Sequence, residues 1–185
     1  FNSVYYTVLG TVINMVLTTM MAYPLSRPHL TFRKFYNVLI LITMFFSGGL
    51  IPTFLTVRNL GLYDTVWAIV LPGAISTWNL IIMRTFFMNL PVELEESAQL
   101  DGANDLTIFS RIILPLSKAS IATITLFYAV SHWNNWFNAM IYFKSSKSYP
   151  LQTILRSIVI NNEMSEEMQV DEVIDSVSAE GIKYS

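Results

Sequence analysis

Polar and aromatic side chains gather in one otherwise apolar stretch of the chain, 119–143. Asparagine amides both donate and accept hydrogen bonds, and an indole ring offers a flat apolar face. At helical spacing Asn134 and Asn138 share a face, so both could point into one path and contact a polar solute without covalent chemistry. The candidate residues are Ser131, Trp133, Asn134, Asn135, Trp136 and Asn138, with Trp78 and Asn79 from an earlier apolar stretch.

The same residues also have a purely structural interpretation. Tryptophans near a helix end commonly anchor at a membrane interface, and asparagines there can hydrogen-bond to neighbouring helices. His132 stands beside them, and a lone histidine is more often a hydrogen-bonded structural residue than a proton carrier or a ligand. Both interpretations stay open at the level of sequence.

Other kinds of chemistry find little support. The chain has no cysteine and only two isolated histidines, His29 and His132, so neither a thiolate nucleophile nor an H-E-x-x-H metal site exists. A net charge of −2 with no basic stripe argues against a nucleic-acid partner. We therefore expect no metal, no catalytic residue and no nucleic acid.

The apolar stretches around these residues are long enough to cross a bilayer. Hydrophobic residues make up 53% of the chain and charged residues only 13%. A bilayer core about 30 Å thick needs about 20 mostly apolar residues in a helix, because no water is present to satisfy the backbone. We expect an all-α, polytopic transmembrane helical bundle with four spans, at about 4–25, 35–57, 65–83 and 119–143.

Basic residues predict the orientation of the spans. The connection at 26–34 holds three basic residues and the one at 57–64 holds one, so the first should face the cytoplasm and the second the outside. Alternation then places 84–118 in the cytoplasm and 144–185 outside.

Helix-breaking residues interrupt two of the expected spans. Gly48, Gly49 and Pro52 lie in the second, and Pro72 and Gly73 in the third. Such residues bend a helix and free backbone groups that neighbouring helices or cavity water must satisfy. Ordinary kinking for packing is the simpler interpretation, and bends that shape a central path are the alternative.

The connection at 84–118 is far longer than two neighbouring helices require, which predicts a structure and purpose of its own. Pro91 suits a helix start, Gly102 a helix stop, and Asn104 or Asp105 the cap of a second helix. The result is a helix–turn–helix. Such a pair could dock in a groove on a partner protein or lie on the lipid headgroups.

The residues of this loop resemble a known family. Glu96-Ser97-Ala98, then Gly102, then Ile112-Ile113-Leu114-Pro115 follow the EAA loop of ABC importer permeases, E-A-A-x3-G-x9-I-x-L-P. Every spacing matches. The one departure is Ser97 for the first alanine, a small-for-small change that still permits close approach.

Further motifs resemble the carbohydrate-uptake branch of that family, the maltose and oligosaccharide type. They are Leu100-Asp101-Gly102-Ala103, Ile113-Leu114-Pro115-Leu116 and Trp133-Asn134-Asn135-Trp136-Phe137. The resemblance implies a multi-pass protein of the bacterial plasma (inner) membrane. Its implied partners are a cytoplasmic ABC ATPase dimer, a second homologous permease subunit, an extracytoplasmic solute-binding protein, a sugar substrate and membrane lipid.

The resemblance also implies a mechanism. The EAA helix docks on the ATPase, and ATP-driven closure of the ATPases switches the permeases between inward-open and outward-open states. This chain has no G-x-x-x-x-G-K-[ST] loop, so it should be no enzyme and bind no cofactor, with ATP bound by the partner. The asparagine and tryptophan set becomes a candidate sugar path.

The resemblance to the EAA motif implies roles for individual residues. Glu96 would make the polar or charged contact with the ATPase, Ala98 the close packing contact, and Gly102 the turn between the two helices. For Asp101, helix capping or a solvated surface charge is the alternative. The full coupling set implied by the resemblance is Glu96, Ser97, Ala98, Asp101, Gly102, Ile112, Leu114 and Pro115.

The resemblance divides the chain into two parts. Residues 1–143 form the ABC transporter transmembrane core, including the EAA coupling loop at 84–118, and 144–185 form an extracytoplasmic loop leading to a final span. Because family members usually have six spans, we expect the chain to be truncated by one helix at each end. Within the loop we expect a short apolar helix or strand at 151–160 and a polar loop at 161–178.

Two rival functions remain to be weighed. An ion-coupled secondary transporter predicts an intramembrane carboxylate or similar group, and the four apolar stretches contain none. A non-transporting membrane scaffold would share the same composition.

Overall fold

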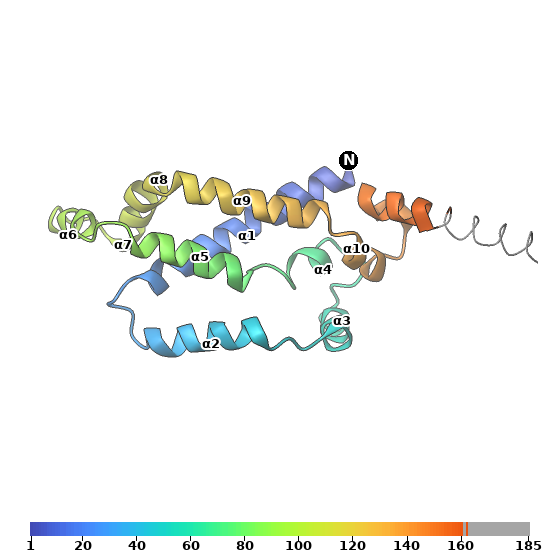
Figure 1. Cartoon of the computed structure of the whole chain (residues 1–185), viewed down its shortest axis with the longest axis horizontal. Helices are drawn as coiled ribbons and strands as arrows, with labels where there is room; N and C mark the ends of the chain where they lie inside the picture. The colour runs from blue at the N-terminus through green and yellow to red at the C-terminus, as the bar shows by residue number, and fades with distance from the viewer. Residues whose placement is uncertain (161, 163–185) are drawn as a thin grey trace, which may run out of the picture.

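The computed structural model describes residues 1–160 and 162, and within them every regular element is helical. Figure 1 shows an elongated arrangement in which α1, α5 and α9 form the body and α2 stands to one side. The elements are α1 (Asn2–Ser26), α2 (Arg33–Phe45), α3 (Leu50–Asn59), α4 (Trp67–Val70), α5 (Thr77–Met88), α6 (Glu93–Leu100), α7 (Asp105–Ile108), the π-helical η1 (Phe109–Ile113), α8 (Leu114–Leu116), α9 (Lys118–Trp133), α10 (Trp136–Tyr142), the 3-10 turn η2 (Ser146–Ser148) and a last helix, Leu151–Ile160.

α1 is apolar on its outer face and polar on its inner face. Its most exposed positions recur every four residues and are Val4, Val8, Val12, Val16 and Met20, each at least half exposed. Its buried positions include Ser3, Gly10, Thr11, Asn14, Thr18 and Thr19. This pattern is the reverse of a surface helix in water and suits an apolar surrounding, with polar groups facing the bundle.

The body of the fold is the packing of α1 against α9 and α5. Gly10 on α1 permits the closest approach, since a Cβ atom there would come within 2.6 Å of the His132 ring on α9. The core between these helices contains Leu80, Met83 and Phe87 of α5 and Ile124 of α9, all almost fully buried.

Of the four predicted spans, only the first is a single helix. α1 is long and apolar enough to cross a membrane, and among the described residues the number of such spans rises to three at most, if each bent pair counts as one. The number four is therefore not confirmed. Of the two alternatives predicted for 151–160, helix or strand, the structure has the helix, Leu151–Ile160, whereas most of the predicted polar loop at 161–178 lies outside the described residues.

The predicted span at 35–57 is two helices, α2 and α3, set at 112° to each other. Between them Gly49 has φ +83°, a conformation that glycine adopts without the strain of a side chain. Pro52 then lies in the first turn of α3, where its missing N–H leaves no intrahelical bond unmade. α2 thus ends before the glycine pair, at Phe45, and Gly49 and Pro52 together begin α3.

The predicted spans at 65–83 and 119–143 are also interrupted. The chain leaves helical geometry around Pro72 and Gly73, between α4 and α5, and again at Asn134 and Asn135, between α9 and α10. The argument that Asn134 and Asn138 share one face of a continuous helix is therefore wrong, because α9 ends at Trp133.

Candidate functional site

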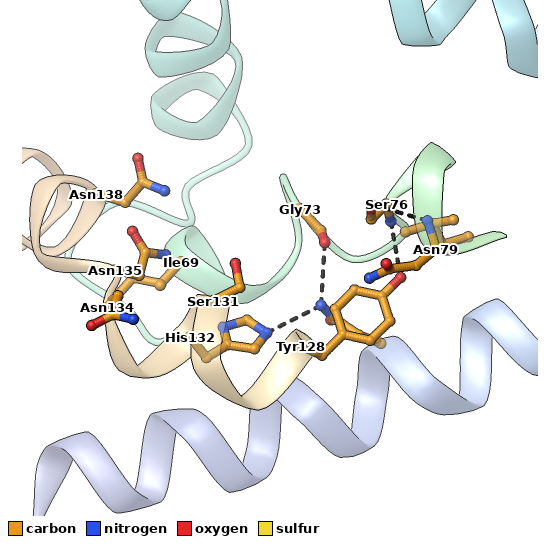
Figure 2. Close-up of a pocket in the computed structure, with 12 residues that line it drawn as sticks. Ile69, Gly73, Ser76, Asn79, Tyr128, Ser131, His132, Asn134, Asn135 and Asn138 are labelled. Carbon is orange, nitrogen blue, oxygen red and sulfur yellow. Dashed lines mark hydrogen bonds between the residues drawn. The ribbon is translucent and has the colours of Figure 1, made fainter. Parts of the chain in front are cut away.

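A polar cavity of about 450 Å³ lies where α1, the α4–α5 connection and the α9–α10 junction meet. Figure 2 shows its asparagines, serine and histidine approaching from these separate segments. The lining residues are Asn14, Ile69, Gly73, Ile75, Ser76, Asn79, Tyr128, Ser131, His132, Asn134, Asn135 and Asn138. The cavity thus forms where two helices are interrupted.

Asn14 holds the first interruption to the body of the fold. Its Nδ2 atom donates to the Gly73 carbonyl oxygen at 3.3 Å and lies 3.1 Å from Nε2 of His132 (Figure 2). Asn14 is only 2% exposed, so its side chain has little access to water. The amide therefore replaces a helical partner for the carbonyl that Pro72 and Gly73 leave free.

Tyr128 provides a second support for the same segment. Its hydroxyl accepts the backbone N–H of Ser76 at 3.0 Å and pairs with Thr18 Oγ1 at 2.7 Å. Ser76 in turn caps α5, since its Oγ accepts the N–H of Asn79 at 3.5 Å. α1 and α9 together therefore fix where α5 begins.

The structure divides the predicted sugar-path residues. Five of them line the cavity: Asn79, Ser131, Asn134, Asn135 and Asn138. The three tryptophans do not. Trp78 is 59% exposed, Trp133 lies on the exposed side of α9, and the Trp136 ring packs under the Arg156 guanidinium, 5.5 Å from the ring centroid.

Sequence reasoning missed Asn14 and Tyr128, and for His132 it favoured a structural role over that of a proton carrier or ligand. His132 does have structural contacts, with Asn14 and against Gly10, and it also lines the cavity. A signal for Asn14 was available, because an asparagine in the middle of an uncharged apolar helix is expensive unless it faces the bundle. Tyr128 carried no such signal, since tyrosine is common on any side of such a helix.

The cavity suits a hydroxyl-rich ligand that binds through hydrogen bonds. Its lining offers amide and hydroxyl groups, which both donate and accept hydrogen bonds, and no charged carboxylate, ammonium or guanidinium. Within residues 1–160 and 162, no cluster of three or more histidine or acidic side chains could hold a metal ion. The chemistry is therefore that of reversible hydrogen bonding.

A second feature, the helix pair α6 and α7, lies at the opposite end of the body (Figure 1). The turn between them contains Gly102 at φ +81°, and the Ala103 N–H donates to the Ala98 carbonyl oxygen at 2.9 Å. Asn104 caps α7, since its Oδ1 accepts the Thr107 N–H at 2.8 Å. The predicted stop and cap positions are thus observed in these roles.

The predicted coupling residues differ in exposure. Glu96 and Ser97 are exposed on α6, and Leu100 beside them is 89% exposed. Ala98 instead packs against the protein's own core, as does Ile112. Asp101, Gly102 and Pro115 are exposed and Leu114 is half-buried.

Glu95, the neighbour of the predicted Glu96, is the buried acid of α6. It forms an ion pair with Arg27, which follows α1. Burial raises the pKa of the Glu95 carboxyl, an effect that the positive charge of Arg27 opposes. These two adjacent glutamates could not be distinguished from the sequence alone.

Comparison with known proteins identifies relatives along most of the chain. The family model described as "Binding-protein-dependent transport system inner membrane component" matches residues 3–168. The polygalacturonan/rhamnogalacturonan transport system permease protein YtcP of Bacillus subtilis is 54% identical over 158 residues, which are 85% of this chain and 55% of that protein. Protein LplC of the same organism is 48% identical over 163 residues, 88% of this chain and 55% of that protein.

A solved structure resembles the fold. It is a bacterial ABC transporter involved in the import of the acidic polysaccharide alginate, and the matched chain superposes with a TM-score of 0.84 at 36% sequence identity. The match covers 91% of this chain and 62% of that chain. The match to the two Bacillus relatives covers about half of the length of each.

Replacement of Tyr128 by phenylalanine tests the cavity wall. The change leaves the Ser76 N–H and the Thr18 hydroxyl without a partner, which should cost about 1–3 kcal/mol of unfolding free energy. We also expect faster backbone amide hydrogen exchange at Ser76, measured by mass spectrometry in lipid nanodiscs.

The matched control is Tyr5→Phe, because the Tyr5 ring is 47% exposed on the outer face of α1. It should change the unfolding free energy by less than about 0.5 kcal/mol. Equal exchange at Ser76 in both variants would contradict the role given to Tyr128.

Proposed function

This chain belongs to the family of binding-protein-dependent transport system inner membrane components, and we propose that it works as a permease subunit of an ATP-driven importer of oligosaccharides. The polar cavity would take part in the sugar's path, and the α6–α7 pair would dock on a cytoplasmic ATPase. The single observation that supports this most strongly is that the helix breaks lining the cavity, α4–α5 and α9–α10, lie toward one end of the body formed by α1, α5 and α9, and α6 lies at the other end (Figure 1).

The cavity supports a sugar as cargo. Sugars present many hydroxyls at close spacing, and each asparagine amide can donate to one hydroxyl while it accepts from another. Asn134, Asn135 and Asn138 lie at or just after the α9–α10 break, and all three line the cavity. The named relatives include a permease for polygalacturonan and rhamnogalacturonan, so an oligosaccharide of plant cell-wall type is the proposed cargo.

The tryptophans then have a different proposed role from the one expected. Trp78 and Trp133 are exposed away from the cavity lining, so they would meet lipid or a second permease subunit rather than a pyranose ring. Recognition in this chain would depend on hydrogen bonds more than on ring stacking.

The helix pair α6–α7 is suited to bind a partner. Glu96, Ser97 and Leu100 form a mixed polar and apolar surface on α6, and Leu106, 70% exposed, extends it onto α7. Leucines at such exposure need a partner to leave water, and a short helix pair fits a groove. We place the ATPase, and hence the cytoplasm, on this side, and propose that Ala98 supports the surface from beneath.

The outer surface of the body is suited to lipid and a second permease. On α2 the exposed side chains are almost all large and apolar, and Ile40 is the buried one. An ion-coupled secondary transporter and a passive scaffold are not favoured, because neither explains the family membership together with an exposed helix pair.

Alanine at both Asn134 and Asn138 tests the sugar path. Loss of about 0.5–1.5 kcal/mol per hydrogen bond should lower uptake about tenfold, with little change in the amount of assembled complex. Uptake of radiolabelled oligogalacturonates into proteoliposomes containing the full importer measures the effect. Asn59→Ala, an exposed asparagine at the end of α3, serves as the control and should leave uptake unchanged.

Gly102→Val tests the docking surface. Because Gly102 has φ +81°, valine adds about 1–2 kcal/mol of backbone strain to the turn and should weaken ATPase binding up to about tenfold. Titration of the ATPase onto nanodisc-embedded permease measures the affinity.

Gly61→Val is the matched control, since Gly61 has φ +70° and equally open surroundings at the other end of the molecule. Equal losses of affinity in the two variants would show that backbone strain in general, and not the α6–α7 turn, weakens the complex.

A further inference from the structure

Arg27 contacts three separate helices at the end of the body that lies nearest α6. One guanidinium nitrogen, Nη2, pairs with Oε1 of Glu95 on α6. The other, Nη1, donates to the carbonyl oxygen of Phe87 near the end of α5, at 3.1 Å. The guanidinium carbon lies 5.3 Å from the centroid of the Tyr23 ring on α1.

These contacts are buried although their groups are charged. Arg27 is 9% exposed and Glu95 is 6% exposed. Removing two charges from water is costly unless each finds its partner in good geometry, so such a pair is a poor choice for stability alone. What it provides is a fixed relative position, because sliding α6 by one residue would leave both charges unpaired.

Neighbouring hydrogen bonds attach the end of α1 to α2, through Arg33, and to α5, through Arg84. The Leu25 carbonyl oxygen, at the end of α1, accepts from Arg33 Nε at 3.0 Å and from Arg84 Nε at 3.2 Å. Two cations at a helix C-terminus also suit the negative end of the helix dipole. The Arg84 contact therefore attaches α5 to α1 close to the place where Arg27 meets both helices.

α6 itself has few other attachments. Among the described residues, Ala98 of α6 packs against the core and Glu95 of α6 pairs with Arg27. The Arg27–Glu95 pair is therefore a polar attachment between α6 and the body.

We propose that the Arg27–Glu95 pair is a joint through which a displacement of α6 reaches α1 and α5, and from them the polar cavity. Both residues are positioning residues, since neither lines the cavity or the exposed docking surface. The route to the cavity is short: α1 carries Asn14 and Thr18, and α5 begins at the Ser76 cap that Tyr128 holds. The source of the displacement, an ATPase bound to α6, rests on the proposed function. The joint itself rests on the contacts of Arg27 and Glu95 alone.

The test compares α6–α1 distances with the joint intact and neutralised. Single cysteines at Leu94 on α6 and Val12 on α1, both exposed, carry spin labels in the full-length subunit in nanodiscs, and pulsed electron resonance gives the distance distribution. The neutral variant is Arg27→Met with Glu95→Gln, which avoids a lone buried charge. Glu93→Gln with Arg111→Met makes the same charge changes at exposed positions and is the control.

For the subunit alone we expect a narrow distribution in the wild type and the control, and one at least twice as wide in the neutral variant. Exchange of the two charges, Arg27→Glu with Glu95→Arg, should narrow it again. A distribution as narrow in the neutral variant as in the wild type would overturn the joint.

The same labels in the complex with the ATPase test transmission. Upon ATP binding, the α6–α1 distance should stay constant in the wild type and change in the neutral variant, because only the intact joint moves both helices together. A wild-type distance that changes upon ATP binding would overturn the inference. If no ATPase binds the subunit, the proposed function is contradicted, and with it the transmission of motion from the ATPase. The distance distribution of the subunit alone would still show whether the Arg27–Glu95 pair holds α6 in place.

Discussion

The fold depends on how backbone groups are satisfied where a helix is broken in apolar surroundings. A free carbonyl or N–H costs several kcal/mol in a medium without water, so each break needs a side-chain partner. α1 is unbroken and supplies such partners: Asn14 contacts the Gly73 carbonyl, and Thr18 holds the Tyr128 hydroxyl that accepts the Ser76 N–H. The polar inner face of α1 is therefore a structural requirement, and the cavity arises beside it because broken backbone and polar side chains gather at one place.

The C-terminal end of α1 is organised by charge. Three arginines converge where α1 ends, two on the Leu25 carbonyl oxygen and one on Glu95 and the Phe87 carbonyl oxygen. The basic residues that the positive-inside rule uses to orient the chain thus also hold helix ends together. Such a helix, held by hydrogen bonds at its middle and by charged groups at its C-terminal end, can connect a hydrogen-bonding cavity to an exposed helix pair.

The sequence predicted the positions of the helices better than the places where the helices are interrupted. Apolar length found the positions of the helices, and Gly102 with Asn104 predicted the turn and cap between α6 and α7, since those are local backbone rules. Glycine and proline marked two of the breaks, but their extent, a 112° bend between α2 and α3, depends on packing partners far along the chain. The break at Asn134 and Asn135 had no such mark, because asparagine is compatible with a helix.

Only part of the candidate site could be predicted from the sequence, because the rest depends on packing between distant segments. Asn134, Asn135 and Asn138 were visible as polar residues in an apolar stretch. The absence of the tryptophans from the lining could not be predicted, because it depends on which face of α5, α9 and α10 each ring occupies after packing. Glu95 and Glu96 are adjacent and alike in sequence, and only the position of Arg27 makes one a buried partner and the other a surface residue.

The central claim is that α6–α7 and the α3–α4 region lie on opposite sides of one membrane. Because the chain has no native cysteine, single cysteines at Leu100 and Leu60, both exposed, can report their sides in whole cells expressing the full-length protein. A membrane-impermeant maleimide added outside should label the Leu60 position and reach the Leu100 position only after the cells are opened. Labelling of the Leu100 position in intact cells would contradict the account.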